Sequence, residues 1–156
     1  MAPAFLFVCL GNICRSPLAE GAMRSAAERA DITLVVDSAG TGDWHIGRPP
    51  DPRAIATAAR HGVDISALRA RQVGQDDFQR FDYIVALDPA NLRDLRMIAP
   101  SSRRATLSLL LDHVQGREGQ GVTDPYFGDA AGFEPVWRDI CQGIEALLHS
   151  FLQTSR

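Results

Sequence analysis

The stretch Phe5-Leu6-Phe7-Val8-Cys9-Leu10-Gly11-Asn12-Ile13-Cys14-Arg15-Ser16-Pro17 decides how this chain folds. Its first four residues are a continuous run of aromatic and branched apolar side chains, which is typical of a strand buried on both faces. Near its end, Ser16 can cap a helix, and Pro17 fits the first helical position, where a missing N–H costs nothing. Apolar side chains then recur at helical spacing, at Leu18, Ala19, Ala22, Met23, Ala26, Ala27 and Ala30. The stretch therefore predicts a strand, a tight loop and a helix in direct succession.

The loop between these two elements has the composition of a phosphate cradle with a nucleophile at its floor. Backbone N–H groups of a tight loop around Gly11 and the positive end of the following helix converge on any anion held there. The same field favours a reactive Cys9, and the planar fork of Arg15 suits phosphoryl oxygens. The alternative interpretation, in which Cys9 is only a small buried hydrophobic residue, leaves the glycine, the arginine and the helix signals unexplained.

The rest of the chain alternates strand and helix signals. Strands are expected near residues 4–9, 32–37, 82–87 and 104–107, and helices near 17–30, 52–61, 89–98 and 132–152. This order predicts an α/β fold: a single domain over residues 1–156, with a four-stranded parallel sheet, helices on both faces and a phosphate-binding loop after strand 1. Such a sheet binds its ligand at the carboxyl ends of the strands, where Cys9 lies. Trp137 and Cys141 follow the apolar spacing of the last helix and are expected in the core.

Charge and cysteine content exclude several classes of function. A net charge of −3 argues against binding of nucleic acid or of an anionic membrane, because either partner needs a dense positive field. No apolar stretch reaches the length of a membrane span. Three cysteines do not form a disulfide framework, which favours a cytoplasmic protein. His45, His113 and His149 lack spaced partners, so neither a metal site nor a cofactor is expected, and we expect a monomer.

The stretch from Cys9 to Glu20 resembles the signature loop of the low-molecular-weight protein tyrosine phosphatases. The resemblance extends in the same order over almost the whole chain, through Asp37-Ser38-Ala39-Gly40-Thr41, Gly47-Arg48-Pro49-Pro50-Asp51, Arg60-His61-Gly62, Asn91-Leu92-Arg93-Asp94-Leu95 and Asp124-Pro125-Tyr126-Phe127-Gly128. It implies metal-independent hydrolysis of phosphotyrosine through a phosphocysteine intermediate. The implied partners are tyrosine-phosphorylated proteins and a cognate tyrosine kinase.

The resemblance also implies a role for each catalytic candidate. Cys9 is the nucleophile, and Arg15 grips the phosphoryl group. Ser16 corresponds to the family residue that hydrogen-bonds the sulfur. Asp124, followed by a proline that forces an extended approach, is the general acid and then the general base.

A second group of residues is expected to shape the cradle and its pocket. Asn12 resembles the family residue that holds the loop in its strained form, with Ser38 supporting it. The chain departs from the family at Leu68, where a histidine is usual, so this support is expected to be weaker or differently built. The substrate-binding residues are expected to be Leu10, Gly11, Asn12, Ile13, Cys14, Trp44, Tyr126 and Phe127, with an aromatic slot that suits a phenyl ring.

Three other functions remain open beside the phosphotyrosine phosphatase. An arsenate reductase of the same fold needs resolving cysteines, and none stands between Cys14 and Cys141. Phosphoarginine phosphatases resemble this loop but tend to carry threonine where Ile13 stands. A binding module without activity would not need Cys9, Arg15 and Asp124 together.

The loop contains a second cysteine. Cys14 lies five residues beyond Cys9 on a chain curled around one phosphate, so their Cα atoms are expected within the window of about 4.4–6.8 Å that a disulfide requires. The resemblance implies that peroxide inactivates such an enzyme reversibly through a Cys9–Cys14 bond, with Cys14 protective. The alternative is that Cys14 only packs beneath the loop.

Overall fold

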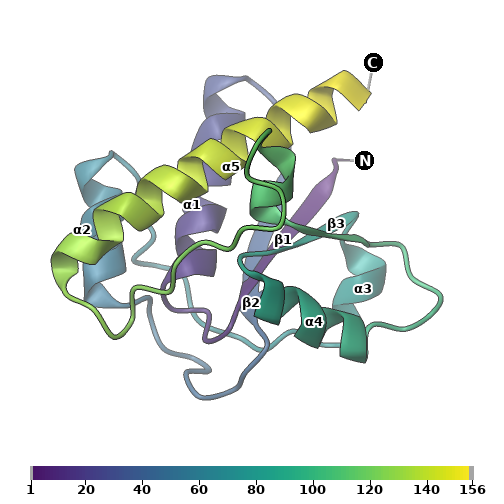
Figure 1. Ribbon diagram of the computed structural model, residues 1–156, viewed down its shortest axis with the longest axis horizontal. Coiled ribbons are helices and arrows are strands. Elements are labelled where there is room, and N and C mark those ends of the chain that lie inside the picture. The colour runs from purple at the N-terminus through teal and green to yellow at the C-terminus, as the bar shows by residue number, and fades with distance from the viewer. Residues whose placement is uncertain (1, 155–156) are drawn as a thin grey trace.

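The computed structural model describes residues 2–154 and confirms the expected sheet of four parallel strands. The strands are β1 (Ala4–Cys9), β2 (Val35–Gly40), β3 (Tyr83–Ala86) and β4 (Thr106–Leu109), in the order β2-β1-β3-β4 (Figure 1). Phe7 of β1 lies opposite Ser38 on one side and Val85 on the other. The strand that leads into the predicted phosphate loop is therefore paired along both of its edges.

Helices cover both faces of the sheet. They are α1 (Arg15–Arg29), α2 (Pro52–Arg60), α3 (Asp77–Arg80), α4 (Pro89–Ile98) and α5 (Phe133–Thr154), with 3₁₀ turns η1 (Leu110–His113) and η2 (Ala130–Gly132). The apolar residues of α1, α2 and α5 pack in one cluster with one face of β1, and those of α3 and α4 pack with the other face (Figure 1). No helix within residues 2–154 is long and apolar enough to span a bilayer.

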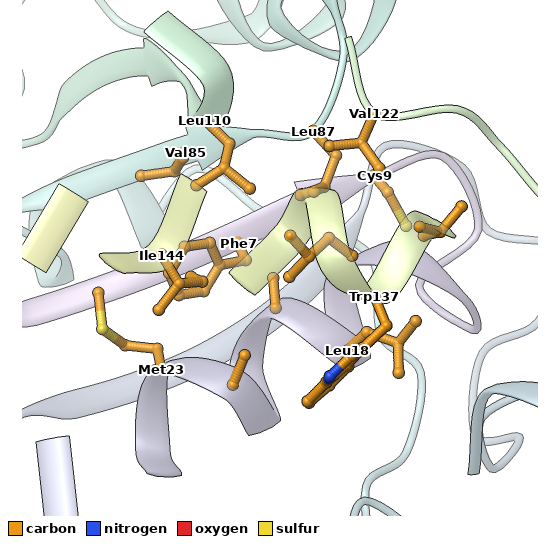
Figure 2. Close-up of a cluster of buried hydrophobic side chains, with 14 of the residues drawn as sticks. Phe7, Cys9, Leu18, Met23, Val85, Leu87, Leu110, Val122, Trp137 and Ile144 are labelled. Atoms are coloured by element: carbon orange, nitrogen blue, oxygen red, sulfur yellow. The ribbon is translucent and has the colours of Figure 1, made fainter. Parts of the chain in front are cut away.

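Strand β1 anchors both halves of the core. Phe5 and Phe7 point to the cluster of α1 and α5, whereas Leu6 and Val8 point to the opposite cluster, and all four side chains are fully buried. Burying a side chain of this size stabilises a fold by about 1.5–3 kcal/mol. Figure 2 shows the first cluster, with labelled side chains that include Phe7, Cys9, Leu18, Trp137 and Ile144. Cys9 therefore begins its loop from a rigid base, and Trp137 is a core residue as expected.

Helix α1 begins at Arg15, two residues before the predicted start. The prediction that Ser16 caps this helix was wrong, because the capping position is Cys14 and no side chain closes the helix end. The Ser16 hydroxyl instead contacts Cys9 and Asn12. Ser16 is thus the second residue of α1, and its hydroxyl supports the loop rather than the end of the helix.

The predicted boundary of β2 was also displaced. Residues 32–34 were expected in the strand, but Asp31 has a φ of 55° and the Ile32 N–H donates to the Ala27 carbonyl at 2.9 Å. These residues close the end of α1, so β2 starts at Val35. The short helix α3 was not predicted. Its Asp77 accepts the Gly74 N–H at 2.8 Å and pairs with Arg71, which are local contacts that apolar spacing does not reveal.

Candidate active site

The predicted phosphate loop runs from the end of β1 to the start of α1 and is fastened to the segment that follows β2. The Thr41 N–H donates to the Cys9 carbonyl at 2.9 Å, and the Gly42 N–H donates to the Leu10 carbonyl at 2.9 Å. The neighbours of β1 are β2 on one side and β3 on the other, so the order in which successive strands are added to the parallel sheet reverses here. Ligands of open parallel sheets bind in the crevice at such a point.

Asn12 holds the loop in a conformation that few non-glycine residues adopt. Its φ is 57°, in the left-handed region, which costs roughly 1–3 kcal/mol unless the surroundings enforce it. The Asn12 amide Nδ2 donates to the Ser16 hydroxyl at 2.7 Å and to the Ser38 hydroxyl at 3.0 Å. The Arg71 backbone N–H donates to Asn12 Oδ1 at 3.0 Å. The amide nitrogen and the amide oxygen of this buried side chain both have hydrogen-bond partners, and these bonds hold the loop in its shape before a ligand binds.

The Ser16 hydroxyl lies between Asn12 and Cys9 and forms hydrogen bonds with both. Its oxygen accepts the Asn12 amide proton at 2.7 Å, and its own proton has two acceptors within reach, Cys9 Sγ at 3.0 Å and the more distant Ala39 carbonyl at 3.4 Å. A hydroxyl that donates to sulfur stabilises the thiolate. Ser16 therefore lies where a donor to the nucleophile is needed.

Support for the loop continues into helix α1 without a histidine. The Ser38 hydroxyl donates to Glu20 Oε1 at 2.7 Å, and Arg24 donates to Glu20 Oε2 from Nε at 3.0 Å and from Nη2 at 2.7 Å. Leu68 packs against the apolar core and takes no part. The support is thus differently built, and the Arg24 guanidinium neutralises the buried Glu20 carboxylate. Sequence reasoning missed both residues, although their i, i+4 spacing on α1 was a readable signal.

Arg15 is almost completely buried beneath the cradle. Its Nη1 donates to Asp88 Oδ2 at 2.6 Å and to the Val122 carbonyl at 2.9 Å, while Nη2 lies 3.6 Å from Asp124 Oδ2. Burial opposes the charge, but Cys9, Asp88 and Asp124 outweigh burial and hold the pKa of Arg15 above its ordinary value. The guanidinium is therefore charged and fixed in direction. Asp88 was not predicted, because it lies 73 residues away in the sequence.

The loop opens into a pocket of about 190 Å³. Its lining contains ten of the predicted site residues, namely Cys9, Leu10, Gly11, Ile13, Cys14, Arg15, Trp44, Asp124, Tyr126 and Phe127. Asn12, Ser16 and Ser38 are buried beside it and support the loop. Phe127 is 92% exposed and Trp44 is 67% exposed, so these two rings form an open rim.

His45 is an additional lining residue that the sequence did not indicate. Its ring lies so close to Gly11 that a Cβ at that glycine would stand 2.9 Å from His45 Cδ2. The ring also lies 6.1 Å from the Tyr126 ring, measured between centroids. A side chain at Gly11 would therefore require the His45 ring to move, and Gly11 itself has no positive φ.

Two further groups complete the chemistry of the pocket. The Asp124 side chain is 39% exposed, and its Oδ1 accepts the Tyr126 N–H at 3.1 Å. Burial, reinforced by the charge of Asp51, raises the pKa of the Cys14 thiol far above its ordinary value. Cys14 is therefore a neutral thiol beside the predicted nucleophile. Within residues 2–154, no three His, Cys, Asp or Glu side chains gather in a way that could hold a metal ion.

Comparison with known proteins identifies the family to which this fold belongs. Residues 4–156 match the profile of the family described as low molecular weight phosphotyrosine protein phosphatase. The chain belongs to this family. It is therefore an enzyme of the protein-tyrosine-phosphatase class, as the resemblance predicted.

Curated members of the low molecular weight phosphotyrosine protein phosphatases align over most of the chain. The protein-tyrosine-phosphatase of Bacillus subtilis is 42% identical over 147 residues, which is 93% of this chain and 93% of the relative. Phosphotyrosine protein phosphatase 1 of Drosophila melanogaster is 39% identical over 155 residues, 98% of this chain and 99% of the relative.

Solved structures agree with the assignment. The crystal structure of the Bacillus subtilis protein has a TM-score of 0.92 at 39% identity and covers 100% of this chain and 98% of its own. A Drosophila protein described as an arginine phosphatase has a TM-score of 0.89 at 32% identity, covering 94% of this chain and 96% of its own. The fold is therefore shared by enzymes with different phosphorylated substrates.

Proposed function

We propose that this phosphatase hydrolyses phosphotyrosine in proteins through a phosphocysteine intermediate on Cys9. The observation that carries the proposal is that Cys9, Arg15 and Asp124 line one pocket, with Ser16 Oγ 3.0 Å from the sulfur. Hydrolysis of a phosphate monoester needs a nucleophile in line, neutralisation of charge and an acid for the leaving oxygen. These residues supply all three.

In the first step, the Cys9 thiolate attacks phosphorus and the bond to the phenolic oxygen breaks. The backbone N–H groups of the loop and Arg15 bind the equatorial oxygens, whose charge grows in the transition state. Asp124, in its protonated form, gives its proton to the departing phenolate. The products of this step are a neutral phenol and phosphocysteine.

In the second step, the ionised Asp124 takes a proton from a water molecule that attacks the phosphocysteine. The phosphorus–sulfur bond breaks, inorganic phosphate leaves and the Cys9 thiolate is restored. The Ser16 hydroxyl, 3.0 Å from the sulfur, donates its proton to this thiolate as it departs and so stabilises it. One carboxyl group thus serves both steps, as the acid and then as the base.

The pocket walls favour an aryl ester. Ile13, Trp44 and Tyr126 present apolar or aromatic surface to a ring held above Cys9. We expect phosphoserine, whose side chain is shorter than that of phosphotyrosine, to reach the sulfur less well through this slot. Arsenate reduction is disfavoured, because Cys141 lines a different hollow between α1 and α5, away from the catalytic pocket.

Phosphoarginine is the second candidate substrate, because an arginine phosphatase is among the similar structures. Ile13 argues for the aryl ester, since its side chain offers apolar contact and no hydroxyl beside the leaving group. The partners on this proposal are tyrosine-phosphorylated proteins.

A panel of phosphopeptides tests the substrate class. With a chelator present, we expect kcat/KM for phosphotyrosine peptides to exceed that for phosphoserine and phosphoarginine peptides by about tenfold or more. Ile13→Thr should lower the phosphotyrosine value and raise the relative phosphoarginine value. A wild-type preference for phosphoarginine, or activity that requires added metal, would contradict the proposal.

We also propose that oxidation regulates the enzyme at the same site. Peroxide oxidises the Cys9 thiolate to a sulfenic acid, the Cys14 sulfur attacks it, and water leaves as the disulfide forms. Both thiols are buried in the catalytic pocket, and neither is in a disulfide in this structure. A reducing thiol would restore both cysteines.

A further inference from the structure

The loop that carries Asp124 has few attachments to the rest of the protein. Of residues 123–130, all except Pro125 are exposed. The Gly128 N–H donates to the Pro125 carbonyl at 3.0 Å, which closes a turn within the loop itself. A general acid needs a fixed position relative to the leaving oxygen, so something must hold this turn in place.

One side chain from helix α2 supplies this attachment. Arg53 Nη2 donates to the Tyr126 carbonyl at 2.8 Å, and Arg53 Nη1 donates to the Gly128 carbonyl at 2.7 Å. Apart from the bonds of Asp129 to Gly132 in the adjoining turn η2, these are the only hydrogen bonds within residues 2–154 that join residues 123–129 to another segment of the chain. Arg15 Nη2 also lies 3.6 Å from Asp124 Oδ2. The guanidinium also lies 4.7 Å from the centre of the Phe133 ring, at the start of α5.

Arg53 is in turn fixed to the phosphate loop. Its Nε and Nη2 donate to the two oxygens of Asp51 at 3.0 and 2.8 Å, and these bonds hold the pKa of the Asp51 carboxyl below its ordinary value. The Asp51 backbone N–H donates to the Ile13 carbonyl at 2.8 Å. The Asp51 carboxylate also caps α2 by accepting the Arg53 N–H at 2.9 Å.

The chain of contacts ends at the catalytic carboxyl group. The Tyr126 carbonyl accepts from Arg53, while the N–H of the same residue donates to Asp124 Oδ1 at 3.1 Å. This leaves Asp124 Oδ2 on the side of Arg15, 3.6 Å from its Nη2. Five residues therefore connect the floor of the cradle with the acid: Ile13, Asp51, Arg53, Tyr126 and Asp124.

We infer that Arg53 is a positioning residue for the general acid. By holding the acid loop, residues 123–129, against the phosphate loop, Arg53 sets the position of Asp124 relative to Cys9. The inference deepens the proposed function and rests on Asp124 as the acid. Arg53 does not line the catalytic pocket. Arg53 acts through two carbonyl groups of the acid loop, each of which accepts a hydrogen bond from a different nitrogen of the planar guanidinium. A lysine has a single nitrogen and cannot reproduce this arrangement of donors.

The test compares Arg53→Ala with wild type over aryl phosphates whose phenols range from weakly to strongly acidic. Protonation matters only for a poor leaving group. We expect kcat/KM, which covers the steps up to release of the phenol, to fall by about tenfold on the weakly acidic phenols and to stay near wild type on the strongly acidic ones. Inhibition by inorganic phosphate should be unchanged, because the loop and Arg15 remain intact. Arg53→Lys keeps the charge beside Asp51 and should show a smaller loss with the same dependence on the leaving group.

The matched control is Arg60→Ala. Arg60 lies on the same helix and also pairs with a distant segment, donating to Glu134 Oε1 at 3.0 Å, but it does not touch the acid loop. This variant should keep the leaving-group dependence of wild type. Thermal unfolding of each variant shows whether the fold is retained.

A double variant distinguishes this inference from the proposed function. If Arg53 acts only through Asp124, Arg53→Ala should cause no further loss in an Asp124→Asn background. Equal losses of kcat/KM on all esters, or losses that add in the double variant, would overturn the positioning role. If Asp124→Asn alone shows no dependence on the leaving group, the acid is another residue, and the proposed function is wrong on that point.

Discussion

At the scale of single residues, Cys9 and Cys14 are identical side chains whose surroundings give them different chemical properties. Cys9 has a hydroxyl donor at 3.0 Å and lies at the floor of the cradle. Burial and the nearby Asp51 charge raise the pKa of Cys14, so that thiol stays protonated at neutral pH. Cys14 therefore does not compete with Cys9 for the phosphorus atom. Under the oxidation proposal above, Cys14 is the partner that captures the sulfenic acid of Cys9.

Replacing Cys14 by Ser should retain most activity and remove the recovery that a reducing thiol produces after peroxide treatment. The matched control is Cys141→Ser, because Cys141 lies on α5 outside the catalytic pocket. We expect that control to recover as wild type does. Full recovery of the Cys14→Ser enzyme would rule out the protective role.

The residues of the active site differ in how well their place in the site can be predicted from the sequence. Cys9, Arg15 and Ser16 stand close together in one motif, so their proximity follows from the local chain. Glu20 and Arg24 also lie on that helix, but their role depends on Ser38, which arrives from β2. Arg53 and Asp88 meet their partners only through the tertiary fold, 73 residues away in each case, and no local pattern marks such a contact.

At the scale of elements, the active site depends on how closely the phosphate loop packs against the end of β2. Gly40 pairs with Cys9 at the last register position of the two strands. A Cβ at Gly40 would stand 2.7 Å from the Leu10 carbonyl oxygen and 3.2 Å from the Asn12 nitrogen. Both neighbours are backbone atoms of the cradle, so they cannot move aside without changing its shape.

Gly40→Ala should therefore weaken phosphate binding more than it weakens the fold. Overpacking of this kind costs roughly 1–3 kcal/mol, and we expect the Kd of inorganic phosphate to rise by about tenfold. Gly74→Ala is the control, because a Cβ there meets open space. Calorimetric titration with phosphate measures the effect. Unchanged affinity in Gly40→Ala would show that the loop tolerates the displacement.

Element boundaries were harder to predict than element types. The strand and helix signals gave the α/β order correctly, because the long apolar patterns of β1 and α5 are unambiguous. The start of β2 was missed, since Ile32 looks like a strand residue but closes α1 through the Ala27 carbonyl. Helix α3 spans only Asp77–Arg80 and was too short to show a period.

At the scale of the whole molecule, the elements on both faces of the sheet contribute to the active site. The cluster with α1, α2 and α5 holds the phosphate loop and the start of the acid loop, through Cys9 and Val122. The helix on the other face contributes Asp88, the capping residue of α4, which fixes Arg15. The site is therefore a product of the complete fold, and its centre is the sulfur at the end of the buried strand.

The most direct test of this account is the turnover of an aryl phosphate by Cys9→Ser, measured together with its affinity for inorganic phosphate. We predict that turnover is abolished while phosphate still binds, because the loop, Arg15 and the Asn12 bonds survive the change. Turnover above about 1% of wild type would contradict a covalent intermediate on Cys9. Loss of phosphate binding together with turnover would contradict the claim that the cradle is preorganised independently of the nucleophile.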